Sequence, residues 1–185
     1  MRLSPDGTRL FISTMKCATN TVYDALEKID WMPITKGVHP KPVERLAEIH
    51  FTICRNPYDR AVSIWASTCL RDEDRYNAKK HILSKSGDPN KFSDFVRICL
   101  DGPITWTPHN WLFSNQTDWY DSMVVDAFCH IENLKPEIES ITGPLEISNI
   151  NVSQHKPWYQ YMTPKIVKRL NKWAGNDFDL GYNKL

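Results

Sequence analysis

Two short apolar runs, each followed at once by a helix-like pattern, constrain the fold of this chain most. The first lies in FISTMKCATNTVYDAL, residues 11–26, and the second in FTICRNPYDRAVSIWA, residues 51–66. A strand that leads directly into a helix is typical of sheets whose neighbouring strands run parallel, because a parallel pair needs a long crossover connection. The pattern therefore predicts an α/β chain.

The first of these helices is expected to begin at residues 20–22. Thr21 followed by Asp24 resembles a capping box, in which two side chains satisfy backbone groups of the first turn. Apolar residues recur at helical spacing from Val22 to Ile29, which predicts one buried face. A strand over residues 9–13 is expected to precede it, after a turn at Asp6-Gly7.

The second helix has a clearer start. Asn56 is a natural N-cap and Pro57 a natural first helical residue, and the strand expected at residues 49–54 ends just before them. A last helix at 163–174 has the same pattern, with Thr163 as its cap and Pro164 in its first position. Both helices are predicted from their first residues alone.

The rest of the chain supplies further elements in the same alternating order. The polar stretch 71–91 is expected to be a surface excursion, and the expected elements are a short helix at 92–100, a strand at 122–131 and a helix at 135–141. Together these predict one domain over residues 1–185, with a mainly parallel central sheet covered by helices on both faces in three layers.

Composition narrows the class of protein. The chain has 185 residues, of which 41% are hydrophobic, and its net charge of +1 gives no indication of nonspecific nucleic-acid binding. Its five cysteines are scattered without a CxxC pair, which predicts reduced thiols rather than a disulfide framework or a zinc site. No run approaches the roughly 20 apolar residues of a membrane span. We expect a soluble, cytoplasmic protein without a membrane partner.

The turn after the first strand is suited to an anion. Backbone N–H groups at a helix start attract negative charge, and Lys16 adds a full positive charge there. The side chains of Thr14, Thr19, Asn20 and Thr21 could add donors to a phosphate or sulfate group. The alternative is that Thr21 or Asn20 only caps the helix and that Lys16 is solvated.

The turn after the second long strand offers a second set of donors. Arg55 ends the strand, and Ser63 lies two helical turns further on, so a guanidinium fork and a hydroxyl are available to a phosphate. Alternatively, Arg55 and Arg60 pair with Asp59 or another carboxylate, and Ser63 is an ordinary helix serine. Two such turns on one sheet favour a ligand with two separated anionic groups.

The glycines disfavour two common nucleotide sites. An ATP or GTP phosphate loop needs GxxxxGK[ST], and a dinucleotide fold needs GxGxxG. Neither pattern occurs, because the seven glycines stand far apart at positions 7, 37, 87, 102, 143, 175 and 181.

The two turns resemble those of the PAPS-dependent sulfotransferases, in particular the carbohydrate (Golgi-type) members; PAPS is 3′-phosphoadenosine 5′-phosphosulfate. FISTMKCATNTVYDAL is similar to their 5′-phosphosulfate loop, which is a strand, Pro-Lys-x-Ala/Gly-Ser/Thr-Thr-Ser and a helix. FTICRNPYDRAVSIWA is similar to their 3′-phosphate motif, Arg-Asn-Pro-Tyr-Asp-Arg-x-x-Ser. HNWLFSNQTDWY, VVDAFCHIENL and DFDLGY resemble further family segments in family order. Met15 stands where proline is usual, and His130 where arginine is common.

This resemblance implies a P-loop-NTPase-like sulfotransferase fold and transfer of a sulfuryl group from PAPS to a hydroxyl or amine without a metal. It implies that Lys16 contacts the 5′-phosphate and the transferring sulfonate, and that Arg55 and Ser63 hold the 3′-phosphate. Lys156 would be a neighbour of a phosphate or of the adenine. The turn residues that would hold the 5′-phosphosulfate are Lys16, Cys17, Ala18, Thr19, Asn20 and Thr21.

An acceptor hydroxyl also needs a base to take its proton. The resemblance points to His39, because a histidine shortly before the second strand serves as base in some glycan sulfotransferases, although HPKP here replaces the family segment. His109 is the second choice, and Glu44 and Asp118 remain open.

The expected acceptor is a carbohydrate or another small hydroxylated molecule. Trp106, Trp111 and Trp119 fall in one loop-rich stretch; they either stack on sugar rings or simply anchor the loop. Two other functions remain open: a small-molecule kinase of related architecture, and a non-catalytic nucleotide-binding module. The sequence leaves the acceptor and the oligomeric state undetermined.

Overall fold

The computed structural model describes residues 1–34, 45–71, 73–74, 76–119, 125–148 and 155–185. These residues group into two compact units, each made of two stretches of chain. Unit 1 comprises Met1–Arg55 and Gln116–Val152, and unit 2 comprises Asn56–Asn115 and Ser153–Leu185. The expectation that residues 1–185 form a single domain stays a prediction.

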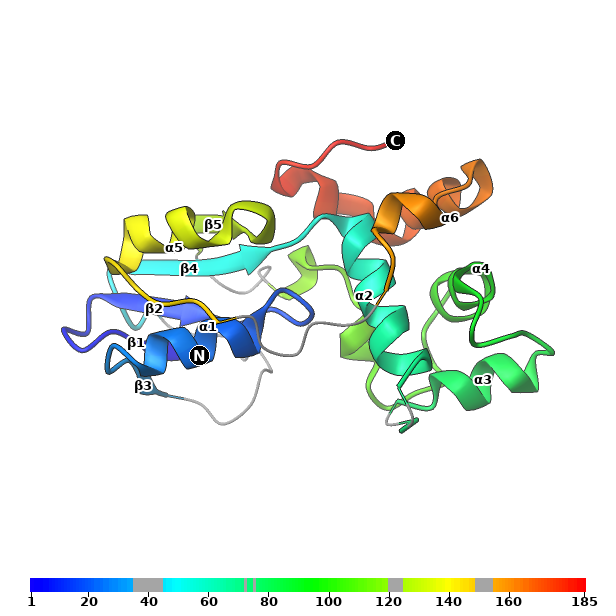
Figure 1. Ribbon diagram of the computed structural model, residues 1–185, viewed down its shortest axis with the longest axis horizontal. Helices are drawn as coiled ribbons and strands as arrows, with labels where there is room; N and C mark the ends of the chain where they lie inside the picture. The colour runs from blue at the N-terminus through cyan, green and yellow to red at the C-terminus, as the bar shows by residue number, and fades with distance from the viewer. Residues whose placement is uncertain (35–44, 72, 75, 120–124, 149–154) are drawn as a thin grey trace. The chain divides into compact units, whose positions relative to one another are not determined.

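Unit 1 contains a five-stranded sheet in the order β3-β1-β2-β4-β5 (Figure 1). The central strands β2, β4 and β5 run parallel to one another. The strands are β1 (Arg2–Leu3), β2 (Arg9–Ile12), β3 (Met32–Pro33), β4 (Ile49–Cys54) and β5 (Ala127–His130). The α/β class is confirmed, and the bounds of β4 match the prediction.

The sheet is mixed, so the prediction of a mainly parallel sheet is only partly right. β1 runs antiparallel to both β2 and β3. The tight turn between β1 and β2 explains the first of these pairings: Gly7 has a φ of 74° there, and the Ser4 N–H donates to the Arg9 carbonyl at 2.9 Å. A turn this short can join only antiparallel strands. The sequence indicated the turn but not the two-residue strands β1 and β3.

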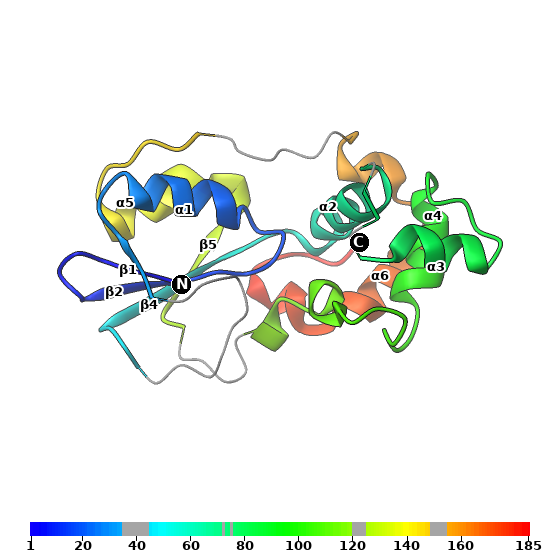
Figure 2. The same ribbon diagram turned by 90° about the horizontal axis from the view of Figure 1, so that it is seen from below.

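Helices α1 (Thr19–Glu27) and α5 (Leu134–Thr142) pack on the same face of this sheet, as Figure 2 shows. Alternate strand residues face them. The buried core residues that these elements share are Phe11, Val22, Leu26, Phe51, Ile53, Cys129 and Ile138. The opposite face carries a smaller cluster around Leu10 and Ile12. Because α1 and α5 share one face, the three-layer arrangement stays a prediction.

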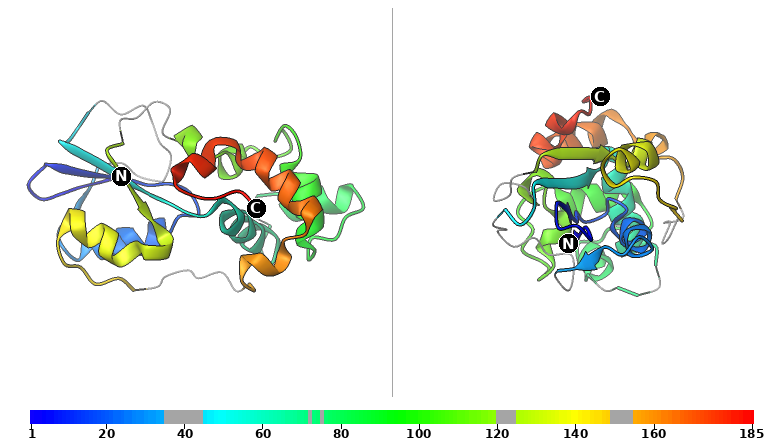
Figure 3. Two further views of the ribbon diagram at one scale, coloured as in Figure 1. Left: turned by 90° about the horizontal axis from the view of Figure 1, so that it is seen from above. Right: turned by 90° about the vertical axis from the view of Figure 1, so that its left-hand side faces the viewer.

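Unit 2 is helical in its described residues (Figure 3). Its α-helices are α2 (Pro57–Cys69), α3 (Ala78–Ser84), α4 (Phe92–Phe95) and α6 (Pro164–Ala174). A π-helical turn, Val96–Leu100, continues α4. The 3₁₀ turns of the unit are Asn110–Phe113, Trp158–Tyr161 and Gly175–Leu180.

The predicted helix starts in unit 2 are confirmed. The Asn56 side chain accepts hydrogen bonds from two backbone N–H groups of α2, and Thr163 accepts one from α6. Helix α3, in contrast, lies in the stretch expected to be a polar excursion. Only Ala78 and Ile82 of α3 are buried, so its apolar stripe was too sparse to recognise.

Candidate functional site

The turn between β2 and α1, residues 13–18, differs from its predicted form. Helix α1 begins at Thr19, and its N-cap residue, Ala18, makes no side-chain capping hydrogen bond. The predicted capping box of Thr21 and Asp24 is therefore wrong; Asp24 pairs instead with Lys28 at 2.8 Å. A helix start without a side-chain cap and without acidic residues is suited to an anion.

The backbone of this turn adopts conformations that favour glycine. Lys16 has a φ of 65° and Ala18 a φ of 54°, both in the left-handed region. For residues with a Cβ this costs about 1–2 kcal/mol each. The turn thus takes a loop shape that glycines usually allow, but with residues that gave no indication of it in the sequence.

Hydrogen bonds donated by the hydroxyls of three threonines stabilise this strained turn. Thr52 donates to the Ile12 carbonyl at 2.7 Å, so the contact of 2.9 Å between the Thr14 and Thr52 hydroxyls has Thr14 as its donor. Thr19 donates its hydroxyl proton to the Thr14 carbonyl at 2.6 Å. In this structure the hydroxyls of Thr14 and Thr19 therefore stabilise the loop; the expected contact of Thr19 with a phosphosulfate stays a prediction.

Unit 1 brings together the two cationic residues expected at the site. Lys16 follows β2, Arg55 follows β4, and these strands are parallel neighbours, so both turns lie at the carboxyl edge of the sheet. The Arg55 guanidinium donates through Nη1 to the Lys16 carbonyl at 3.1 Å. The two turns are thus in direct contact.

A third side chain joins both turns. Gln116 is fully buried, and its Oε1 accepts hydrogen bonds from the Arg55 backbone N–H at 2.8 Å and from the Cys17 Sγ at 3.0 Å. Its Nε2 donates to the Arg55 carbonyl at 2.8 Å. Sequence reasoning assigned Gln116 no role, although it is the glutamine of HNWLFSNQTDWY, a segment that resembles the family.

The other residues of the predicted nucleotide site differ widely in exposure. In unit 1 Cys17 and Thr21 are buried and Asn20 is exposed. In unit 2 Ser63 is buried on α2, and Lys156 is exposed and bonds the Tyr161 hydroxyl through its backbone N–H at 3.1 Å. Their contacts with the donor stay predictions.

The candidate bases are placed only in part. His39 and Glu44 lie outside the described residues. In unit 2 the His109 ring packs edge-on against the rings of Tyr76 and Trp111. Asp118, in unit 1, is exposed. No base is assigned by these positions, and His39 stays a prediction.

Arg60, which follows the second turn, pairs with a buried carboxylate. Arg60 is fully buried in unit 2 and pairs with Asp177, also fully buried, at 3.7 Å. Tyr58, two residues earlier, donates to the Asn171 side chain at 2.5 Å and packs against Trp158 and Phe178. The alternative that an arginine of this turn pairs with a carboxylate is therefore correct for Arg60, with Asp177 as the partner rather than Asp59.

The loop tryptophans show packing contacts. In unit 2, Trp106 stacks on His81 with ring centroids 4.8 Å apart. Trp119, in unit 1, is 3% exposed. These contacts favour the interpretation that the tryptophans anchor the loop.

The five cysteines form no disulfide and are all buried, in agreement with the prediction of reduced thiols. Burial raises the pKa of the Cys129 thiol to about 12 and that of Cys69 to about 11. These two thiols are therefore protonated at neutral pH and behave as small apolar groups.

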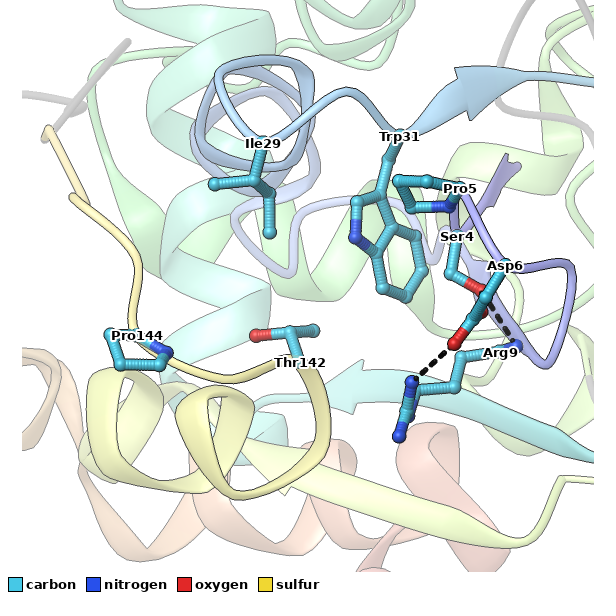
Figure 4. Close-up of a pocket in the computed structure, with 8 residues that line it drawn as sticks. All are labelled: Ser4, Pro5, Asp6, Arg9, Ile29, Trp31, Thr142 and Pro144. Atoms are coloured by element: carbon cyan, nitrogen blue, oxygen red, sulfur yellow. Dashed lines mark hydrogen bonds and ion pairs between the residues drawn. The ribbon is translucent and has the colours of Figure 1, made fainter.

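A cavity of about 300 Å³ lies in unit 1, away from these turns (Figure 4). It is lined by Ser4, Pro5, Asp6, Arg9, Ile29, Trp31, Thr142 and Pro144. These residues lie before or at the start of β2 and at or after the ends of α1 and α5, which is the amino edge of the parallel strands. Arg9 pairs there with Asp6 at 3.1 Å. The cavity is thus at the opposite edge of the sheet from Lys16 and Arg55.

No group of three or more His, Cys, Asp or Glu side chains among the described residues could hold a metal ion. No helix within the described ranges is long and apolar enough to cross a membrane.

Comparison with known protein families gives a match over most of the chain. A family model described as the sulfotransferase family matches residues 16–169. This range begins at Lys16 and includes Arg55, Ser63, Gln116 and Lys156. No curated protein and no solved structure matches the chain.

Proposed function

We propose that this chain, which belongs to the sulfotransferase family, uses PAPS as its donor and a carbohydrate or other small hydroxylated molecule as its acceptor. Membership rests on the family match over residues 16–169, and sulfuryl transfer is the activity that membership supports. The identity of the donor and the class of acceptor are the proposal.

The contact between Arg55 and the Lys16 carbonyl is the observation that supports PAPS most. PAPS carries two anionic groups on one nucleoside, a 5′-phosphosulfate and a 3′-phosphate. Lys16 and Arg55 stand on adjoining turns, and the Arg55 Nη1 lies 3.1 Å from the Lys16 carbonyl oxygen. A guanidinium suits a phosphate because its planar fork donates two parallel hydrogen bonds.

Each turn has a distinct task in the proposed reaction. Lys16 and the start of α1 stabilise the charge that develops on the oxygen between phosphorus and sulfur as the S–O bond breaks. Arg55 and Ser63 bind the 3′-phosphate, and Lys156 lies near a phosphate or the adenine. The acceptor oxygen forms the new bond to sulfur and gives its proton to a base, for which His39 is the first candidate. The products are a sulfated acceptor and 3′-phosphoadenosine 5′-phosphate (PAP).

The proposed acceptor follows from the family resemblance, and the proposed cellular location follows from the composition. A hydroxyl or amine of a carbohydrate is the proposed acceptor, and the proposed location is the cytoplasm. The proposal includes no metal, no nucleic-acid partner and no membrane partner.

A thermal-shift experiment tests the donor. PAP is expected to raise the melting temperature more than AMP at equal concentration, because only PAP carries the 3′-phosphate. In the Arg55→Ala variant this difference should vanish. Arg97→Ala is the matched control, since Arg97 lies in an exposed ion pair with Asp94 in unit 2, and it should keep the difference.

Three results would overturn the proposal. Equal stabilisation of the natural chain by AMP and PAP would exclude a site for the 3′-phosphate. Stronger stabilisation by ATP with magnesium would favour the kinase alternative. Selective PAP binding without transfer to any acceptor, including water, would leave the non-catalytic nucleotide-binding module as the function.

A further inference from the structure

The amide of Gln116 has only one orientation that satisfies its partners. The Arg55 backbone N–H can only donate and its carbonyl can only accept, so Oε1 must face the first and Nε2 the second. The structure shows this pairing, with both distances at 2.8 Å. The side chain thus bonds the main chain of Arg55 as a neighbouring strand would, at the point where β4 ends.

The same amide also contacts the first turn. Its Oε1 accepts the Cys17 thiol at 3.0 Å, and Cys17 follows Lys16 directly. Arg55 completes the connection by donating to the Lys16 carbonyl at 3.1 Å. Each of these contacts lies within unit 1. A single buried side chain therefore joins the backbone that carries the guanidinium to the turn that carries the lysine.

We propose that Gln116 is a positioning residue that fixes the spacing between Arg55 and the Lys16 turn, and thereby sets the preference of the site for a nucleotide with a 3′-phosphate. The inference rests on the proposed function. Binding sites hold their charged groups accurately only when the supporting shell is itself locked by packing and hydrogen bonds. Gln116 meets this condition, because it is buried and bonds three groups of the two turns.

The test compares two nucleotides in variants at position 116. Gln116→Met keeps the length of the side chain and removes its hydrogen bonds. The dissociation constant for PAP, measured by isothermal titration calorimetry, should rise roughly tenfold or more, since misplacement by about 1 Å can cost far more. The constant for AMP should change by less than about threefold, because AMP makes no use of Arg55 through a 3′-phosphate.

A double-mutant cycle separates positioning from a general structural role. If Gln116 acts through Arg55, Gln116→Met should cause no further loss of PAP affinity in an Arg55→Ala background. Additive losses would contradict the inference. Asn90→Asp, an amide-to-carboxylate change at an exposed residue of unit 2, should leave both affinities unchanged.

Gln116→Glu provides a second variant if the methionine variant does not fold. The glutamate keeps the acceptor oxygen but places its second oxygen against the Arg55 carbonyl, unless it is protonated and donates there. Its PAP affinity relative to the natural chain should therefore be lowest at pH 8 and partly recover at pH 5.5. No recovery at pH 5.5 would count against the role of the Nε2 donor.

The two proposals fail in different ways. If the natural chain binds PAP no better than AMP, the proposed function fails and the inference falls with it. If the natural chain prefers PAP and the folded Gln116→Met variant keeps the same preference, only the inference fails.

Discussion

The two strand-to-helix turns of this chain differ in how the helix that follows is capped. Every helix start presents backbone N–H groups without intrahelical partners. At the second turn the Asn56 side chain accepts from the N–H groups of Tyr58 and Asp59, and Asp59 adds a negative charge to the first turn of α2. At the first turn Ala18 stands in the cap position, where it can offer no such bond.

The difference indicates how each turn would bind an anion. The N-cap residue of α1 has no side-chain acceptor, so the backbone N–H groups and Lys16 can bind an anion together there. The start of α2 is occupied by its own cap and carries Asp59, so a phosphate near the second turn has to be bound by side chains such as that of Arg55. The first turn is suited to the reacting group, and the second to an anchoring group.

The largest expected effect tests how firmly the second turn is supported. Asp177→Ala leaves the charge of Arg60 buried without its partner, and breaking a buried pair in this way typically costs about 3–5 kcal/mol. We expect a loss of that size in the free energy of unfolding, measured by urea denaturation. Arg97→Ala breaks the exposed ion pair of Arg97 with Asp94 and should cost less than about 1 kcal/mol. Equal losses in the two variants would show that the buried pair has no special role.

The next effect concerns the first turn and its chemistry. Lys16→Met should lower the rate of transfer from labelled PAPS to a panel of sugar acceptors by about 100- to 1,000-fold, as expected for loss of one group that stabilises developing charge. The affinity for PAP should fall much less, because the backbone of the turn remains. Lys135→Met, at an exposed position on α5, is the control and should be as active as the natural chain. A Lys16→Met variant with normal turnover would remove the first turn from the reaction.

The two turns also differ in how far the sequence could predict them. Asn56 and Pro57 follow a strong local rule, and the structure confirms both. The first turn combines an alanine cap with two non-glycine residues at positive φ, and no local rule indicates this. Its shape depends on Thr52 and Gln116, which come from distant parts of the chain. Tertiary contacts of this kind are not visible in a single sequence.

A similar limit applies to the charged residues. The sequence indicated that an arginine of the second turn could pair with a carboxylate, but Asp177 is separated from Arg60 by more than half of the chain. The roles of Lys16 and Arg55 were inferred from a resemblance, and their contact supports placing them in one site. Gln116 was missed because a glutamine in a loop usually interacts with solvent.

A smaller effect is expected from the cap of the second turn. Asn56→Ala removes the acceptor for two N–H groups and should lower the free energy of unfolding by about 1 kcal/mol. Urea denaturation measures the change, with Asn90→Ala in an exposed loop as the control. A loss close to zero would show that the stability of α2 does not depend on its cap. The difference in capping between α1 and α2 would then have no effect on stability.

The smallest effect should have the opposite sign, because the first turn lacks an optimal residue at its cap. Ala18→Gly relieves the left-handed backbone, which is worth about 1 kcal/mol, but it also frees the unfolded chain, so we expect a net gain of about 0.5 kcal/mol. Ala18→Val at the same position should instead cost more than about 1 kcal/mol, since a β-branched residue tolerates positive φ poorly. The two variants differ only in how well position 18 accepts this backbone. If glycine destabilises the chain as valine does, the packing of the Ala18 side chain contributes more to stability than the strained backbone costs, which would contradict the prediction.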